Sequence, residues 1–225
     1  MLKVFRSGRL VCAVLLLGGF APAMAQQFSS DIVTTRDNVS APAGRLWVRD
    51  ASVRIETPEL PNGFFLVDSA KPSAYFVRPA TRVYMDARQS SRLTQLFVPV
   101  DPSEPCRSWQ TMAQLAGVAG QGEWRCERTG REEIKGRSAE VFRVTTSESC
   151  GFVAWLDPER RFPLRITTAD GAVIALEHIR EEPQSTSLFE LPPNLRKFDP
   201  ATLVERIKQS DVWVAEPGEA DPSHR

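Results

Sequence analysis

Residues 44–56 read GRLWVRDASVRIE, and this stretch decides the fold of the chain. Apolar side chains recur at every second position before and after Arg49-Asp50, and charged residues stand between most of them. The alternating apolar residues are Leu46, Val48, Val53 and Ile55. Because successive side chains of a β-strand point to opposite faces of its sheet, this period of two predicts two short antiparallel strands that share one buried face.

The same alternation continues along most of residues 28–180, between turns such as Pro61-Asn62-Gly63 and Asp170-Gly171. We therefore expect a mainly β (α+β) fold with about ten short strands. Besides the two strands above, the expected strands begin at Phe28 and cover residues 64–67, 74–78, 82–86, 140–146, 151–156, 163–168 and 173–180.

Two interruptions in the middle of the chain have helical spacing. Ser90 or Ser91 can cap a short helix, and a second helix is expected from Ser108 to Ala116. The apolar residues at helical spacing are Leu93, Leu96 and Phe97 in the first helix and Trp109, Met112 and Leu115 in the second.

The composition changes after Leu191-Pro192-Pro193. Asp199-Pro200 is a good N-cap and first-turn pair for a short helix with Leu203 and Ile207 on one side. The end of the chain from Glu216 is acidic and contains proline, so we expect the last ten residues to be disordered.

The first 25 residues have the features of a cleaved secretory signal. Three basic residues precede an apolar run from Leu10 to Phe20, and Ala23-Met24-Ala25 before Gln26 matches an A-x-A cleavage site. The run is shorter than the ~20 apolar residues that span a bilayer. Cys12 lies inside the run and lacks the preceding small residue of a lipoprotein signal. We therefore expect a periplasmic mature chain with no integral membrane segment.

The charge balance argues against a nucleic-acid partner. The full chain has 28 Lys and Arg residues and 28 Asp and Glu residues, and cleavage after Ala25 removes three basic residues and no acidic ones. Nucleic-acid binding needs a concentrated basic surface that displaces counterions. The mature chain, at about 200 residues, fits one domain with a C-terminal tail.

Three cysteines remain after cleavage: Cys106, Cys126 and Cys150. An oxidising compartment favours pairing two of them. Cys106 follows a proline in a polar connection, and Cys126 opens a strand beyond a glycine-rich stretch, so we expect a Cys106–Cys126 disulfide that fixes this insert to the sheet. The spacings fit neither a CxxC redox motif nor a zinc site, and Cys150 is expected to be a buried small apolar residue.

The sequence offers few groups for catalysis. It has two histidines: His178 is expected to face solvent from a strand, and His224 lies in the terminal tail, so they form neither a triad nor a metal site. Glu132-Glu133 and Glu181-Glu182 are adjacent pairs, which point to opposite faces of a strand and cannot flank one glycosidic bond. We expect no cofactor, no metal and no catalytic residues, with an enzyme as the third-ranked interpretation.

Aromatic residues are spread at one or two per strand, which either lines a cavity or fills a core. These residues are Trp47, Phe65, Tyr75, Tyr84, Phe142 and Trp155.

Two sets of motifs resemble the LolA/LolB-like lipoprotein-carrier superfamily and its periplasmic relatives over roughly residues 28–198. The first set is Gly44 to Asp50 with the strands 53–56, 64–67, 75–77 and 83–85. The second set is Gly136-Arg137 with residues 141–144, 153–157 and 162–166 and the F-x-L-P element at 187–192. The motifs are structural and not catalytic.

The resemblance implies a curved, incomplete antiparallel β-barrel over residues 26–198, with short helices plugging its concave side, followed by a tail at 199–225. It also implies an apolar cavity and no enzymatic activity. LolA has Arg-Pro after its Gly-x-Leu-Trp-Val element, where this chain has Asp50-Ala51, so the lid latch of LolA does not transfer. By alternation, the residues expected to line the concave side are Leu46, Val48, Val53, Ile55, Phe65, Val67, Val83, Val144, Val153 and Trp155.

The expected function is non-enzymatic binding of a lipid or a lipoprotein acyl chain, for transport or for sensing, since a related sensor domain has the same fold. The alternative is a cell-envelope scaffold whose cavity is filled by its own side chains and whose protein partner docks on the sheet edge or the tail.

Overall fold

The structure is a computed structural model that describes residues 26–87, 91–117, 122–146, 151–200, 202 and 205. The expected signal segment, Cys150 and the last ten residues lie outside these ranges, and their predictions stay predictions. Of the expected C-terminal helix, Pro200, Thr202 and Glu205 are described and are helical.

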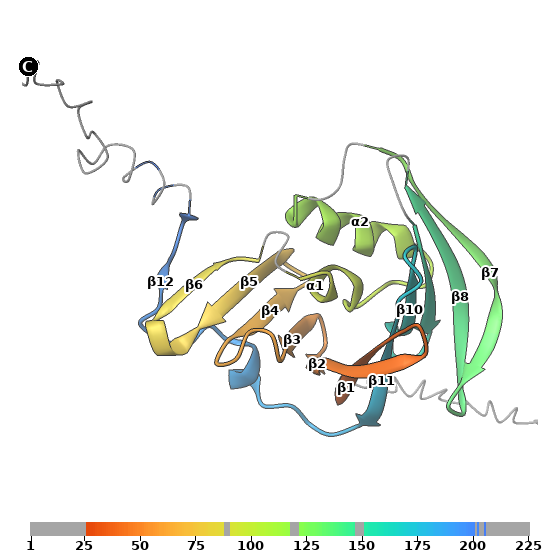
Figure 1. The fold of residues 1–225 in the computed structure, drawn as a ribbon, viewed down its shortest axis with the longest axis horizontal. Helices are drawn as coiled ribbons and strands as arrows, with labels where there is room; N and C mark the ends of the chain where they lie inside the picture. Colours follow the sequence, from red (N-terminus) through yellow and green to blue (C-terminus); the bar gives the residue numbers. More distant parts are fainter. Residues whose placement is uncertain are drawn as a thin grey trace, which may run out of the picture.

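The described residues form one curved sheet of twelve strands, which is not closed into a barrel (Figure 1). Neighbouring strands pair antiparallel, except that β12 pairs parallel with β6. The strands are β1 (Gln27–Arg36), β2 (Val39–Arg49), β3 (Ser52–Glu56), β4 (Phe64–Asp68), β5 (Ser73–Arg78), β6 (Val83–Asp86), β7 (Trp124–Ile134), β8 (Arg137–Thr146), β9 (Phe152–Asp157), β10 (Phe162–Thr168), β11 (Val173–Arg180) and β12 (Arg196–Lys197).

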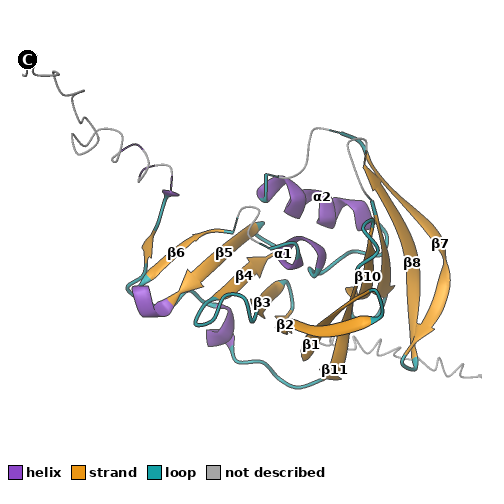
Figure 2. Cartoon of the chain, viewed as in Figure 1, coloured by secondary structure: helices purple, strands orange, loops and turns teal. Residues whose placement is uncertain are grey.

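The strand order is β12-β6-β5-β4-β3-β2-β1-β11-β10-β9-β8-β7, so β1 lies between two meanders. The connection from β6 to β7 joins the two ends of the antiparallel part and carries α1 (Leu93–Leu96) and α2 (Pro105–Leu115). Both helices lie on the concave side of the sheet, between its two wings, which are β3–β6 on one side and β7–β11 on the other (Figures 1 and 2). The expected half-barrel with helices on its concave side is confirmed.

Two short 3-10 helices complete the described elements, η1 (Pro79–Thr81) and η2 (Thr186–Phe189). The N-cap residue of α1 is Arg92, which makes no side-chain cap hydrogen bond, and Ser91 just before it accepts a hydrogen bond from the Leu93 amide at 3.2 Å. The second helix begins earlier than expected, because Pro105 occupies its first turn, where a missing N–H costs nothing.

The expected number of strands was too small. The sequence motifs gave no bounds for β7, whose side chains are mostly exposed on both faces and therefore lack an apolar period of two. The first half of β2 is also mostly exposed, so it too lacks an apolar period of two. β12 is defined by its backbone pairing with β6, and its two residues are too few to show an alternation of side chains.

Gly44 marks the bend in β2 at which the apolar alternation begins. The β1–β2 register shifts between Ile32 and Val33 beside it. Gly44 has φ +154°, and a Cβ there would lie 2.3 Å from the carbonyl oxygen of Glu56. Only glycine allows the end of β3 to approach this closely, so the bend depends on this residue.

The segment after β11 crosses the outer face of β2–β6 before it ends in β12. Arg54 donates to the carbonyl of Leu188 at 3.3 Å and stacks on Phe64, with 3.5 Å from its guanidinium carbon to the ring centroid. A second, smaller apolar cluster on this wing contains Phe64, Leu66 and Val77, packed with Tyr75, Tyr84 and Leu195. Leu195 follows the expected F-x-L-P element, which therefore belongs to a strap over the outer face.

Candidate functional site

The concave face of the sheet is continuously apolar. Seven of the ten residues predicted to line it belong to one core cluster, and each is at most 2% exposed. These seven are Leu46, Val48, Val53, Ile55, Phe65, Val67 and Val144. Val83 is partly buried and lies two positions from Met85, which packs against the same cluster. The structure therefore brings these residues to one surface; their role in binding stays a prediction.

Two predicted positions were assigned to the wrong face of β9. Ala154 and Leu156 belong to the concave cluster and are fully buried, which directs Val153 and Trp155 to the opposite face. Trp155 donates its indole N–H to a Glu132 carboxylate oxygen at 2.8 Å, and the Arg165 guanidinium lies 3.8 Å from its ring centroid. The residues 152–156 are apolar at every position, so their alternation has two solutions and the larger side chain was wrongly placed inside.

Several concave residues were not predicted, although they follow the same alternation on neighbouring strands. They include Phe28, Ile32, Phe76, Phe142, Phe162, Ile166, Ile174 and Leu176. Of the six aromatics noted in the sequence, Phe65 and Phe142 belong to this cluster.

The helices and the segment between them cover this face. Trp109 of α2 is 1% exposed, donates its indole N–H to the carbonyl of Leu96 at 3.1 Å, and packs edge-to-face on Phe152 with ring centroids 5.1 Å apart. The other buried members of the cover are Leu93, Leu96, Phe97, Val98, Val100 and Met112. We call these residues and Trp109 the cover. The concave face is thus filled by side chains of the chain itself.

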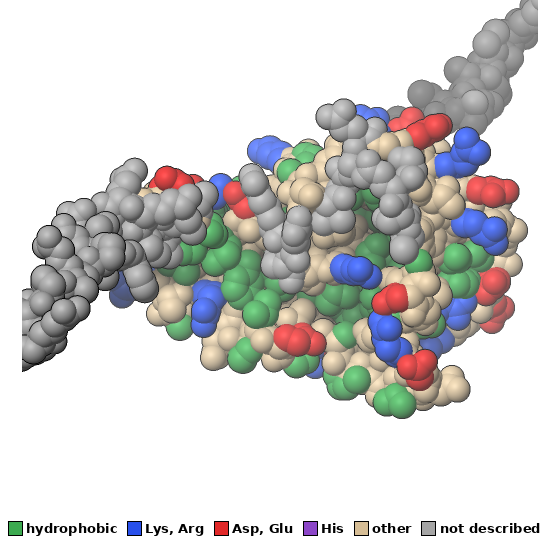
Figure 3. Space-filling model, turned by 45° about the horizontal axis from the view of Figure 1, so that its top comes forward, with side chains coloured by type: hydrophobic (Ala, Val, Ile, Leu, Met, Phe, Trp, Pro, Cys, Tyr) green, Lys and Arg blue, Asp and Glu red, His purple; other side chains and the backbone are tan. Residues whose placement is uncertain are grey.

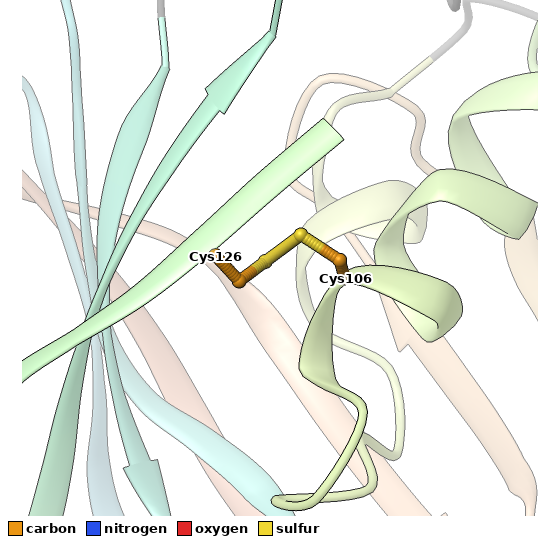
Figure 4. The surroundings of a disulfide bond; sticks show 2 residues. All are labelled: Cys106 and Cys126. Atoms are coloured by element: carbon orange, nitrogen blue, oxygen red, sulfur yellow. A yellow bond between two sulfur atoms is a disulfide. The ribbon is translucent and has the colours of Figure 1, made fainter. Parts of the chain in front are cut away.

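The predicted Cys106–Cys126 disulfide is confirmed, with Cα atoms 5.6 Å apart (Figure 4). Cys106 lies in the first turn of α2, and Cys126 lies near the start of β7. The bond therefore joins the N-terminal end of α2 to the outermost strand of one wing.

A pocket of about 200 Å³ lies at the other end of α2, against β5 and β6. Its lining is mixed. The apolar lining includes Ala74, Ala87, Met112 and the exposed Leu115, and the polar lining consists of Ser73, Tyr75, Asp86 and Thr94. Figure 3 views the molecule from the side of the helices, and hydrophobic side chains gather across the middle of this face. Two of its lining residues, Ala87 and Met112, also belong to the concave core cluster.

Charged residues form a network on the outer face around Asp31 of β1. Arg45 donates to Asp31 at 3.1 Å, and His178 Nδ1 lies 3.1 Å from the other carboxylate oxygen. Partial burial of Asp31 opposes ionisation, but the hydrogen bonds of Arg45 and His178 outweigh it and lower the pKa of Asp31. The His178 side chain is 72% exposed, as a strand histidine facing solvent was expected to be.

No group of three or more His, Cys, Asp or Glu residues that could hold a metal ion is found within the described ranges. No helix among these residues is long and apolar enough to cross a membrane.

No protein-family model and no curated protein matches the chain by sequence. Solved structures do match. PNGF-II matches with a TM-score of 0.50 and 9% identity over 82% of this chain and 34% of its own, so the chain spans about a third of the length of PNGF-II. MucB, in the MucA/MucB complex from Pseudomonas aeruginosa, matches with a TM-score of 0.42 and 16% identity over 76% of this chain and 57% of the matched chain.

A putative outer membrane lipoprotein-sorting protein domain from Vibrio parahaemolyticus also matches, with a TM-score of 0.35 and 9% identity over 73% of this chain and 89% of its own. The identities of these three matches are below 25%, and only the match to PNGF-II reaches a TM-score of 0.50, so it bears on the fold alone.

Proposed function

We propose that the mature chain is a periplasmic, non-enzymatic protein that binds a lipid or a lipoprotein acyl chain on the concave face of its half-barrel, for transport or sensing. The observation that carries this proposal is the apolar concave face, whose cover includes only two helices of 4 and 11 residues. An acyl chain exposed to water costs about 0.8 kcal/mol per CH₂, so movement through an aqueous compartment requires such a protected surface.

The proposed location rests on the sequence of the first 25 residues, with its basic, apolar and A-x-A regions. The disulfide is consistent with it, because disulfides persist in oxidising compartments such as the periplasm.

Binding on the concave face requires the cover to move, because Trp109 and Phe97 now occupy the volume that a ligand would take. The cover is attached to the sheet at one end by the disulfide, while the rest of it is held by non-covalent packing. A ligand can therefore replace part of the cover without breaking a strand of the sheet.

The test begins with protein purified from its own envelope and analysed by native mass spectrometry, followed by titration with a fluorescent fatty acid. We expect a co-purified lipid or lipoprotein, and saturable binding that an unlabelled acyl chain competes. Absence of both co-purification and saturable binding contradicts the proposal.

One observation favours the second candidate function, an envelope scaffold with a self-filled core. The side chains of the cover are already as buried against the concave face as residues of a protein interior: Trp109 is 1% exposed and Phe97 is 0% exposed. The edge strand β7 is poorly suited to pair with a strand of a partner protein, because it has a bulge between Arg128 and Gly130 and charged side chains along its length. Stable capture of an envelope protein without any lipid supports this alternative.

A further inference from the structure

We infer that the pocket between the C-terminal half of α2 and strands β5 and β6 binds one linear alkyl chain, and that a hydrophobic ligand enters the molecule there. This inference rests on the proposed function and adds to it the place of entry and the number of chains admitted.

The pocket borders the concave core. Met112 and Ala87 line it and also belong to the core cluster, and Ala74 lines it and packs against that cluster. Leu115, 37% exposed, is one of the few large apolar side chains of the described residues that are this accessible. An alkyl chain lying in the pocket would contact Leu115 at the surface and Met112 inside.

The two ends of α2 differ in how they are held. The N-terminal half is fixed by the disulfide to β7 and by Trp109, which packs on Phe152 of β9. The C-terminal half meets β5 across the pocket. Separation of the helix from the sheet at the N-terminal end would strain a covalent bond, so a ligand can part them only at the end where the pocket lies.

The dimensions select the ligand. A volume of about 200 Å³ is below the ~300–1,000 Å³ of sites that enclose drug-sized molecules, so the pocket accepts one narrow chain and not a pair. Asp86 is the one charged lining residue, and it is already paired with Lys197 at 2.9 Å, while the other polar lining residues, Ser73, Tyr75 and Thr94, are uncharged. The pocket is therefore selective for the chain more than for the head group, and a free fatty acid and a lysophospholipid share the required chemistry.

The experiment compares Leu115→Trp with Gln114→Trp in the full mature protein. Both positions are exposed on α2, but only Leu115 lines the pocket. We expect Leu115→Trp to weaken binding of a fluorescent fatty acid at least tenfold and Gln114→Trp to leave it within about twofold, with equal melting temperatures. Competition by unlabelled palmitate and by lysophosphatidylcholine identifies the source, and one or both should compete better than a diacyl phospholipid.

A fatty acid with a diazirine on its chain gives a second measurement on the wild-type protein. We expect cross-linked peptides that contain Ala74, Met112 or Leu115. Equal affinities of the two variants, or cross-links confined to β7 and β8, overturn the place of entry while wild-type binding still supports the proposed function. Absence of wild-type binding overturns both.

Discussion

Removal of the Cys106–Cys126 disulfide is the perturbation whose effect follows most directly from the structure. The bond closes a segment with a sequence separation of 20. For a loop of this length, the loss of chain entropy in the unfolded state is about 11 cal/mol/K, or about 3 kcal/mol at 25 °C. We therefore expect the double variant Cys106→Ser, Cys126→Ser to lose about 3 kcal/mol of unfolding free energy.

The assay is urea unfolding followed by tryptophan fluorescence, in which Trp109 at the concave face reports loss of the cover. Both the double variant and its parent should carry Cys150→Ser, which prevents disulfide exchange. Because the reduced parent has the same free chain as the double variant, the two should have the same midpoint. Relative to the oxidised parent, the double variant should unfold at a lower urea concentration. Its slope m should show little decrease, since the surface buried on folding is unchanged.

Two results would refute this reasoning. A loss below about 1 kcal/mol would mean that the native bond is strained or that the unfolded insert stays compact without it. Non-reducing peptide mapping that links Cys150 to either partner would refute the pairing itself.

Three further outcomes are expected. Trp109→Ala should lower the free energy of unfolding by about 3–5 kcal/mol, because it opens a cavity under the cover. If the cover competes with the ligand, the same variant should bind a fluorescent fatty acid more tightly. A weaker or unchanged affinity would contradict that competition. Gly44→Ala should cost about 1–3 kcal/mol in urea unfolding because its Cβ would meet the Glu56 carbonyl, whereas Gly130→Ala, with nothing within 4 Å, should change stability by less than about 0.5 kcal/mol; equal losses would be evidence against the close approach. The folded-state pKa of Asp31 is below its unfolded value, so ionised Asp31 contributes its full stabilisation above about pH 5 and loses it as pH falls through about 4 and below. Asp31→Asn should therefore flatten the acidic part of the curve of unfolding free energy against pH. An unchanged curve would exclude this contribution.

Sequence reasoning located the concave face most directly where charged residues mark the outer side of a strand; in β4 it also chose Phe65 and Val67 correctly, although residues 64–67 are all apolar. In β2 and β3, Arg45, Arg49, Arg54 and Glu56 mark the outer positions and Trp47 is the one apolar exception, so Leu46, Val48, Val53 and Ile55 were assigned to the concave side, which the structure confirms. In β9 every position from Phe152 to Leu156 is apolar, and the alternation could not distinguish the faces. The outer face there is occupied by Trp155 stacked on Arg165, a contact between strands that no local pattern encodes.

The disulfide could be predicted because few cysteines remained and their surroundings differed. The cover could be predicted only in part: the apolar spacing indicated two helices, but the burial of Trp109 and the hydrogen bond to Leu96 depend on how α1 and α2 pack together. The strap over the outer face was not expected, because its contacts are made by backbone carbonyls such as that of Leu188 with side chains far along the chain.

The two candidate functions differ in one quantity, the free energy needed to lift the cover from the concave face. If that cost resembles the loss of one large core side chain, it is about 3–5 kcal/mol. Each CH₂ of a ligand transferred from water to the concave face contributes about 0.8 kcal/mol, so about four to six methylenes offset it. A long acyl chain can bury more than this, and the surplus determines its affinity. A cover that costs well above 10 kcal/mol to lift would instead exclude ordinary acyl chains, and the same fold would then serve as a scaffold. The measured stability loss of Trp109→Ala, together with its change in fatty-acid affinity, therefore separates a carrier from a scaffold.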